Sequence, residues 1–97
     1  MAWAFVETVP EGSIEAYDKV VAELGDIGTP DGLILHLAGM SEKGMRVIDV
    51  WESKAHHDRF RSQTLLPAME RALGHPPDAD VLFEPMDVHH LFPSAEH

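Results

Sequence analysis

The segment GMRVIDVWESKAHHDRF, Gly44–Phe60, decides how the rest of the chain is interpreted. Met45–Glu52 is predicted to be a strand that ends in a tryptophan and an acid, and Ser53 is a suitable N-cap for the helix that follows. Ser41–Gly44 is a hairpin signal whose glycine can adopt a positive φ. Leu33–Met40 is therefore predicted to be the partner strand.

Working outward, Ala2–Val9 is apolar and β-rich and is predicted to be a first strand. Ser13 can cap a first helix, whose buried stripe follows helical spacing at Ile14, Tyr17, Val20, Val21, Leu24 and Ile27. Pro67 predicts a kink in the second helix or two helical pieces, the second running from Pro67 to Leu73. Val81–Leu91 is predicted to be a fourth, irregular strand broken by Pro85.

The order βαββαβ predicts an α+β fold, a ferredoxin-like sandwich with a four-stranded antiparallel sheet and two helices on one face. We expect a single domain over residues 1–92 and a loose tail over residues 93–97. Nothing in the chain remains to cover the other face of the sheet, and its strands are apolar on both sides. We therefore expect a homodimer, a dimeric α+β barrel.

Composition limits the classes of partner. The chain has 97 residues, with 7 Lys+Arg against 17 Asp+Glu and a formal charge of −10, so nucleic acid and membrane partners are not expected. It contains no cysteine, which excludes disulfides, thiolate metal sites and a thiol nucleophile. No apolar run approaches the roughly 18 residues of a membrane span. The N-terminal residues lack the basic lead of a signal peptide, so we expect a cytoplasmic protein.

The strand Val47–Trp51, the Trp-Glu-Ser sequence and the helix containing Phe60 and Leu65–Met69 carry a family resemblance. Together they resemble the dimeric α+β-barrel superfamily, and within it the small antibiotic-biosynthesis-monooxygenase-like proteins. The resemblance implies the same fold and a dimer. That superfamily includes cofactor-independent oxygenases of polyketide-like phenols, haem-degrading enzymes, cyclases, isomerases and members without known activity.

The haem-degrading branch does not fit. Its members use an Asn on the first strand, a Trp on the second helix and a His further along. Counted from Trp51, those positions correspond to Glu7, Phe60 and Glu70. The axial haem ligand is absent, and we expect no cofactor.

The hairpin places candidate chemistry on one face. A register that pairs Met40 with Met45 puts His36 opposite Asp49 and Ile34 opposite Trp51, whereas a slip of two residues puts His36 opposite Trp51. We expect this face to look toward a cavity on the dimer side. The more apolar set on the other face is expected to pack against the helices, and it comprises Leu33, Leu35, Leu37, Ile48 and Val50.

A carboxylate beside an imidazole is a usable acid/base pair, in which Asp49 holds the tautomer and His36 moves a proton. We expect four further residues to contact substrate: Trp51, Glu7, Phe60 and His89. The predicted function is proton abstraction from a flat, hydrophobic molecule by a cofactor-independent monooxygenase or a cyclase/isomerase. The alternative is a ligand-binding or assembly protein in which the pair is only a structural contact.

The chain contains seven histidines, which could bind a metal ion, but their spacing argues against a metal site. His56 and His57 are adjacent on a helix and point about 100° apart, and His89 and His90 point to opposite faces of a strand. A composite site of His36, Asp49 and either His89 or Asp87 is conceivable but disfavoured. We expect no metal, with His56, His57, His75 and His97 in solvent.

Overall fold

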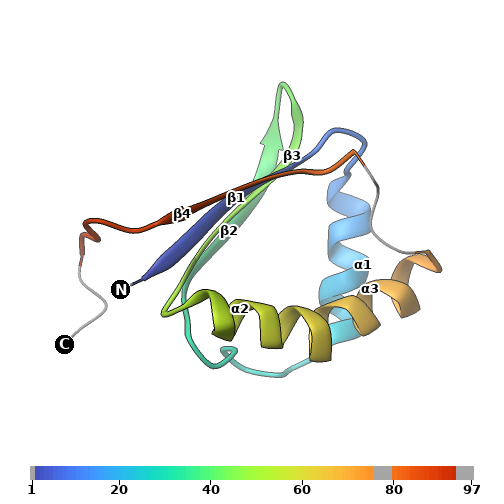
Figure 1. The fold of residues 1–97 in the computed structure, drawn as a ribbon. Coiled ribbons are helices and arrows are strands. Elements are labelled where there is room, and N and C mark those ends of the chain that lie inside the picture. Colours follow the sequence, from blue (N-terminus) through green and yellow to red (C-terminus); the bar gives the residue numbers. More distant parts are fainter. Residues whose placement is uncertain (1, 76–79, 94–97) are drawn as a thin grey trace.

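The structure, a computed structural model, describes residues 2–75 and 80–93. Its four strands form one antiparallel sheet in the order β2-β3-β1-β4, and the helices lie on one face of it (Figure 1). The ferredoxin-like βαββαβ prediction is confirmed. The predicted tail lies, apart from Pro93, outside the described residues. The elements are β1 Trp3–Val9, α1 Ile14–Leu24, β2 Leu33–Ser41, β3 Gly44–Trp51, α2 Lys54–Phe60, the π-helical turn η1 Arg61–Leu65, α3 Leu66–Leu73 and β4 Leu82–Asp87.

The helix after β3 continues from α2 through η1 into α3 without a gap (Figure 1). Ser53 caps it, since its Oγ accepts a hydrogen bond from the His56 backbone N–H at 3.2 Å. Pro67, which has no N–H to donate, stands at the start of α3 directly after the π-helical turn. The predicted second helical piece is therefore confirmed, starting one residue earlier. It ends at Gly74, whose φ is +76°.

The ends of α1 and β4 depend on local features, and the end of β4 differs from the prediction. The helix α1 ends at Leu24, because the N–H of Gly25 bonds to the Val21 carbonyl at 3.2 Å with a φ of +70°. Strand β4 ends at Asp87 rather than at Leu91, and Pro85 does not break it. Proline is tolerated there because β4 is an edge strand that pairs with β1 alone.

The apolar stripe of α1 is less buried than predicted, since no residue of this helix is fully buried. Ile14 and Val21 are 44% and 45% exposed. The helix packs mainly against α3. Much of the apolar side of α1 is therefore still in contact with solvent in the single chain.

The core lies between the sheet and α2. Trp3 and Phe5 of β1 and Trp51 of β3 are buried, with Leu33, Val47 and Phe60 packed against them. Trp51 is 1% exposed and is the largest fully buried side chain among the described residues. No helix in the described part of the chain is long and apolar enough to cross a membrane.

The two faces of the sheet are reversed relative to the prediction. The face that carries His36, Asp49 and Trp51 packs toward the helices, whereas Leu35 and Leu37 are 46% and 47% exposed on the other side. The prediction compared only the apolar residues of β2 and β3. It did not count Trp3 and Phe5 of β1, which lie on the same face as Trp51 and complete the core there.

A bulge in β2 changes part of the predicted register. His36 pairs with Asp49 and Met40 with Met45 as predicted, but Leu33 rather than Ile34 pairs with Trp51. The extra residue between Leu33 and Leu35 moves Leu33 to the helix side, where it joins the core. Leu33 therefore packs on the helix side as predicted, but it does not share a face with Leu35 and Leu37.

Candidate functional site

The predicted pairing of His36 with Asp49 exists as a direct hydrogen bond. The two residues are cross-strand partners on β2 and β3, and their side chains share the helix-side face. The Nδ1 of His36 donates to Oδ1 of Asp49 at 2.6 Å. Because Asp49 is an acceptor, it holds the neutral imidazole with its proton on Nδ1 and its lone pair on Nε2.

Two more side chains extend this pair into a continuous hydrogen-bonded chain. The Tyr17 hydroxyl, from α1, lies 2.6 Å from Nε2 of His36 and donates to it when the imidazole is neutral. The indole Nε1 of Trp51 donates to the other carboxylate oxygen of Asp49 at 3.1 Å. Tyr17, His36, Asp49 and Trp51 are called the polar chain below. It connects α1, β2 and β3.

Within the polar chain, burial increases from His36 through Asp49 to Trp51. The side chain of His36 is 37% exposed, that of Asp49 is 10% exposed, and Trp51 is buried in the core. Solvent or a ligand can therefore reach the polar chain at its Tyr17–His36 end, where β2 forms an edge of the sheet. The Asp49–Trp51 end is fixed by packing.

The electrostatics keep protons on the outer half of the polar chain. The hydrogen bond to Asp49 raises the pKa of His36 above its ordinary value of 6.5, and this effect exceeds the opposing effect of burial. Burial, followed by the charges of Asp49 and Asp18, raises the pKa of Tyr17. Tyr17 is therefore a neutral hydroxyl that can donate to His36 or accept from it.

Glu7 lies beside the polar chain on the central strand β1. It pairs with Val47 while Phe5 pairs with Asp49, so both carboxylates lie on the helix side of the sheet. Burial raises the pKa of Glu7; the Arg61 guanidinium opposes this effect and the Asp49 charge adds to it. Glu7 can thus retain a proton at a higher pH than an exposed glutamate.

Phe60 contacts the polar chain through packing, with its ring 5.6 Å from that of Trp51. It also lines an open depression of about 310 Å³ between the α2–η1 helix and the loop before β2. Other residues around the depression are Ile27, Thr29, Pro30, Asp31, His56, Arg59, Gln63 and Thr64. His36, Asp49 and Trp51 are not among the residues that line it, so this depression is separate from the polar chain.

His89 does not belong to the candidate site. It is exposed and follows β4, which is the edge strand opposite to β2, so that β1 and β3 lie between it and His36 (Figure 1). The prediction failed because His89 was assigned to a strand that ends before reaching it. The same separation excludes the composite metal site, since Asp87 pairs with Trp3 at that far edge.

The positions of two side chains, Tyr17 and His57, were not predicted. Tyr17 was expected to fill the core, although its hydroxyl on the sheet-facing stripe of α1 needed a polar partner. His57 was expected in solvent but is 5% exposed, and its ring lies against four aromatic rings, those of Trp3, Phe5, Trp51 and Phe83. The sequence did contain a signal for the burial of His57: it lies three residues before Phe60, so both side chains are on one face of the helix. Of the other histidines expected in solvent, His75 is exposed, His56 is partly buried, and His97 lies outside the described residues.

Comparison with solved structures confirms the fold. No protein-family model matches the chain, and no curated protein matches it. Similar structures include a mutant of SnoaB from Streptomyces nogalater, a cofactor-independent oxygenase, with 15% identity over 96% of this chain and 98% of that one and a TM-score of 0.65. A proposed antibiotic biosynthesis monooxygenase from Caulobacter crescentus has 14% identity over 92% and 91% of the two chains and a TM-score of 0.67.

A third similar structure is a dimeric ferredoxin-like protein of unknown function from Jannaschia sp. CCS1, with 14% identity over 91% of this chain and all of that one and a TM-score of 0.62. The resemblance to antibiotic-biosynthesis-monooxygenase-like proteins, first inferred from Trp51 and its surroundings, is thus confirmed at the level of the fold. At such identities the comparison establishes the architecture and leaves the activity to be argued from the residues themselves.

Proposed function

We propose that the chain is an enzyme that removes a proton from a flat, hydrophobic, weakly acidic molecule, as a cofactor-independent monooxygenase or as a cyclase or isomerase. The observation that carries the proposal is the polar chain, in which a carboxylate fixes an imidazole that is itself reachable at one side. A fold shared with a cofactor-independent oxygenase supports it.

In this mechanism His36 is the general base. Asp49 accepts from Nδ1, so the lone pair on Nε2 is directed at Tyr17. A substrate placed against Tyr17 transfers its proton to the phenol oxygen while Tyr17 passes its own proton to Nε2. The products are a substrate anion and an imidazolium ion beside the Asp49 carboxylate, and that ion pair stabilises the separated charge.

The substrate anion has two fates. In an oxygenase it gives one electron to O₂, the resulting radical pair combines into a peroxide anion, and that anion takes a proton from the His36 imidazolium. Loss of water, which includes a second hydrogen of the same carbon, then leaves a carbonyl group. In a cyclase the carbanion attacks an electrophilic carbon in the same molecule, and in an isomerase it regains the proton at another atom. Phe60 and Glu7, which flank the polar chain, are proposed to contact the substrate, Phe60 by stacking on a flat ring.

The enzyme is proposed to be a homodimer that joins through the outer face of the sheet. Four large apolar side chains of that face are 46–54% exposed: Leu35, Leu37, Leu82 and Met86. A second copy would cover this apolar area. Light scattering at micromolar concentration tests the dimer, and a monomeric mass contradicts it.

Exchange of substrate protons with D₂O tests the chemistry, because it reports proton removal whether or not oxygen takes part. The probes are polycyclic phenols and 1,3-diketones, with the C–H signal followed by NMR and oxygen uptake followed in parallel. We expect His36→Gln and Asp49→Asn to slow exchange by about 10²–10⁴-fold. The matched control is Glu42→Gln, at an exposed turn residue. Exchange at the wild-type rate in both site variants would contradict the mechanism.

The second candidate function is non-catalytic ligand binding or assembly. One observation favours it: the polar groups of the polar chain satisfy one another, and the depression lined by Phe60 does not include them. Such a protein binds the probes without exchanging their protons. Binding measured by Trp fluorescence, together with no exchange in the wild type, therefore selects this function over the first.

A further inference from the structure

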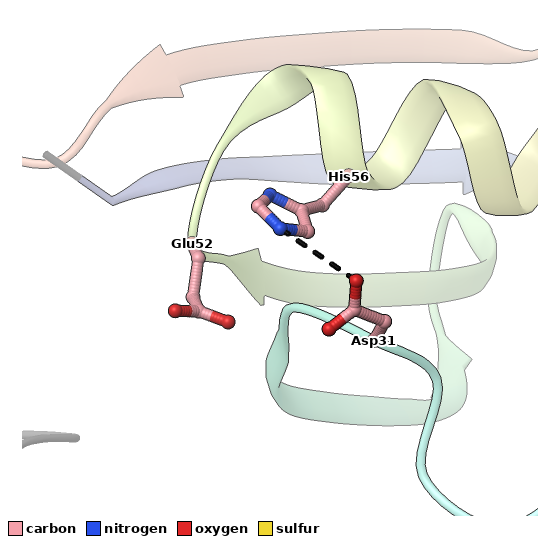
Figure 2. Close-up of side chains that lie close together, drawn as sticks. All are labelled: Asp31, Glu52 and His56. Carbon is pink, nitrogen blue, oxygen red and sulfur yellow. Dashed lines mark ion pairs between the residues drawn. The ribbon is translucent and has the colours of Figure 1, made fainter.

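Three potential metal ligands converge at the end of the sheet nearest the start of α2. Asp31 comes from the loop before β2, Glu52 follows the last residue of β3, and His56 lies in the first turn of α2 (Figure 2). One ligand atom from each lies within 4.8 Å of the other two, and Nε2 of His56 is 3.9 Å from Oδ2 of Asp31. None of the three belongs to the polar chain.

The backbone holds the three segments in place. The N–H of Glu52 donates to the carbonyl of Gly32 at 2.7 Å, which ties the end of β3 to the loop that carries Asp31. Gly32 has a φ of +87°, and a Cβ added there would clash with the His56 ring. The imidazole therefore packs directly on the glycine, and its position is fixed more firmly than that of an exposed side chain.

The orientation of the His56 ring suits a metal ligand. Its Nδ1 is 2.6 Å from the hydroxyl oxygen of Ser53, so Nε2 is the nitrogen that faces Asp31 (Figure 2). Histidines that bind a metal through one nitrogen commonly donate from the other nitrogen to an oxygen acceptor. Ser53 can provide that acceptor. This imidazole distinguishes the group from a simple cluster of exposed acids.

We propose that Asp31, Glu52 and His56 bind one divalent transition-metal ion of the zinc class. One imidazole nitrogen and two carboxylate oxygens are ligands that Zn²⁺ accepts, and three protein ligands leave a fourth position for water or another molecule. Ligands about 2.1 Å from a tetrahedral zinc stand roughly 3.4 Å apart. Asp31 and Glu52 are exposed, so rotation of their side chains closes the remaining gap.

A neighbouring cation gives the proposal a sharper test. Nη1 of Arg59 lies 3.9 Å from Oδ2 of Asp31 and competes for the carboxylate that the metal would use. Arg59, Asp31 and His56 all line the depression of about 310 Å³. A metal held by two of these residues would therefore border that depression, and its fourth position would be available to a small molecule bound there.

The experiment uses untagged protein, freed of metal by chelation, and measures binding of Zn²⁺ by calorimetry and of Co²⁺ by its visible absorption. We expect one ion per chain. His56→Gln and Glu52→Gln should each weaken binding at least tenfold, whereas Arg59→Gln should strengthen it. The control is His89→Gln with His90→Gln, which removes two histidines outside the site and should leave binding unchanged.

Weaker metal binding in Glu52→Gln together with stronger metal binding in Arg59→Gln would support the site. A general loss of stability would instead weaken metal binding in both variants. Circular dichroism checks that each variant is folded. If His56→Gln does not fold, Glu52→Gln tests the proposal, because Glu52 is exposed and its replacement should leave the fold intact. Absence of stoichiometric binding in the wild type would overturn the proposal. So would equal affinity in the wild type and Glu52→Gln, or binding abolished by the His89/His90 control.

Discussion

The two faces of the sheet contrast sharply, although both are rich in apolar residues. The helix side buries Trp3, Phe5 and Trp51 and also carries the polar chain. The outer side leaves Leu35 and Leu37 about half exposed. The helix side is therefore completed by the chain itself, while the outer side stays partly exposed to solvent in the single chain. An apolar face in a sequence indicates burial but does not identify what buries it.

The largest expected effect is on the helix side. Trp51→Ala should lower the free energy of unfolding by about 3–5 kcal/mol, because it leaves a cavity in the core and removes a hydrogen bond to Asp49. Urea denaturation measures the loss. Leu37→Ala is the comparison on the outer face, and at concentrations where the chain is monomeric it should cost less than about 1 kcal/mol. Equal losses would show that the two faces do not differ as described.

On the outer face the main effect should be on association rather than on folding. Introducing Leu35→Asp and Leu37→Asp together should weaken self-association at least 100-fold, because two carboxylates would be buried in the proposed interface. Sedimentation velocity measures the change. Val21→Asp is the control, since Val21 is 45% exposed on α1 and lies away from this face. Unchanged association in the double variant would place the interface elsewhere.

The polar chain should respond to loss of its carboxylate. In Asp49→Asn the pKa of His36 should fall from its raised position to 6.5 or below, since the hydrogen bond that raises it is lost while burial remains. Asparagine still accepts from Trp51, so the core is preserved. Titration of the His36 ring protons by NMR measures the change, and a pKa that stays raised would contradict the assignment.

The same pair predicts the pH dependence of stability. A raised pKa means that the folded state binds the proton of His36 more tightly than the unfolded state. This contribution is fully present below the unfolded value of about 6.5. It is lost as pH rises through the higher pKa of the folded state. Unfolding measured from pH 5 to 9 should show this decline in the wild type and a weaker one in Asp49→Asn.

The smallest expected effect is at Glu7. Its pKa is raised, mainly by burial, so its ionised form disfavours the folded state and stability declines as pH rises through the folded pKa. Glu7→Gln should therefore stabilise the protein at pH 7 by up to about 1 kcal/mol, and the gain should vanish at low pH. The control Glu42→Gln, in an exposed turn, should change stability neither at pH 7 nor at low pH. Thermal unfolding at the two pH values measures the difference.

Much of the fold could be predicted because it depends on local signals. The hairpin at Gly44, where φ is +116°, and the Ser53 cap follow from short-range backbone chemistry. Pairing of Met40 with Met45 then places His36 opposite Asp49. The bulge before Leu35 could not be predicted, because one extra residue in a strand leaves no mark in the alternation of apolar and polar residues.

The candidate sites show the same limit. His36 and Asp49 were predictable because they are neighbours within one hairpin. Tyr17 was missed because its partner lies 19 residues away on another element. The potential metal ligands Asp31, Glu52 and His56 come from three segments and have no recognisable spacing. Only the folded backbone brings them together.

The sequence by itself determined the element order and the antiparallel hairpin, because each depends on residues close along the chain. It left Asp49 and Trp51 as alternative partners of His36, and the folded strands selected Asp49. Tertiary structure decided which face of the sheet the helices cover. That choice depends on the combined bulk of Trp3 and Phe5 from β1 and Trp51 from β3. It turned the His36–Asp49 pair inward to meet Tyr17 and left the leucines of the other face about half exposed.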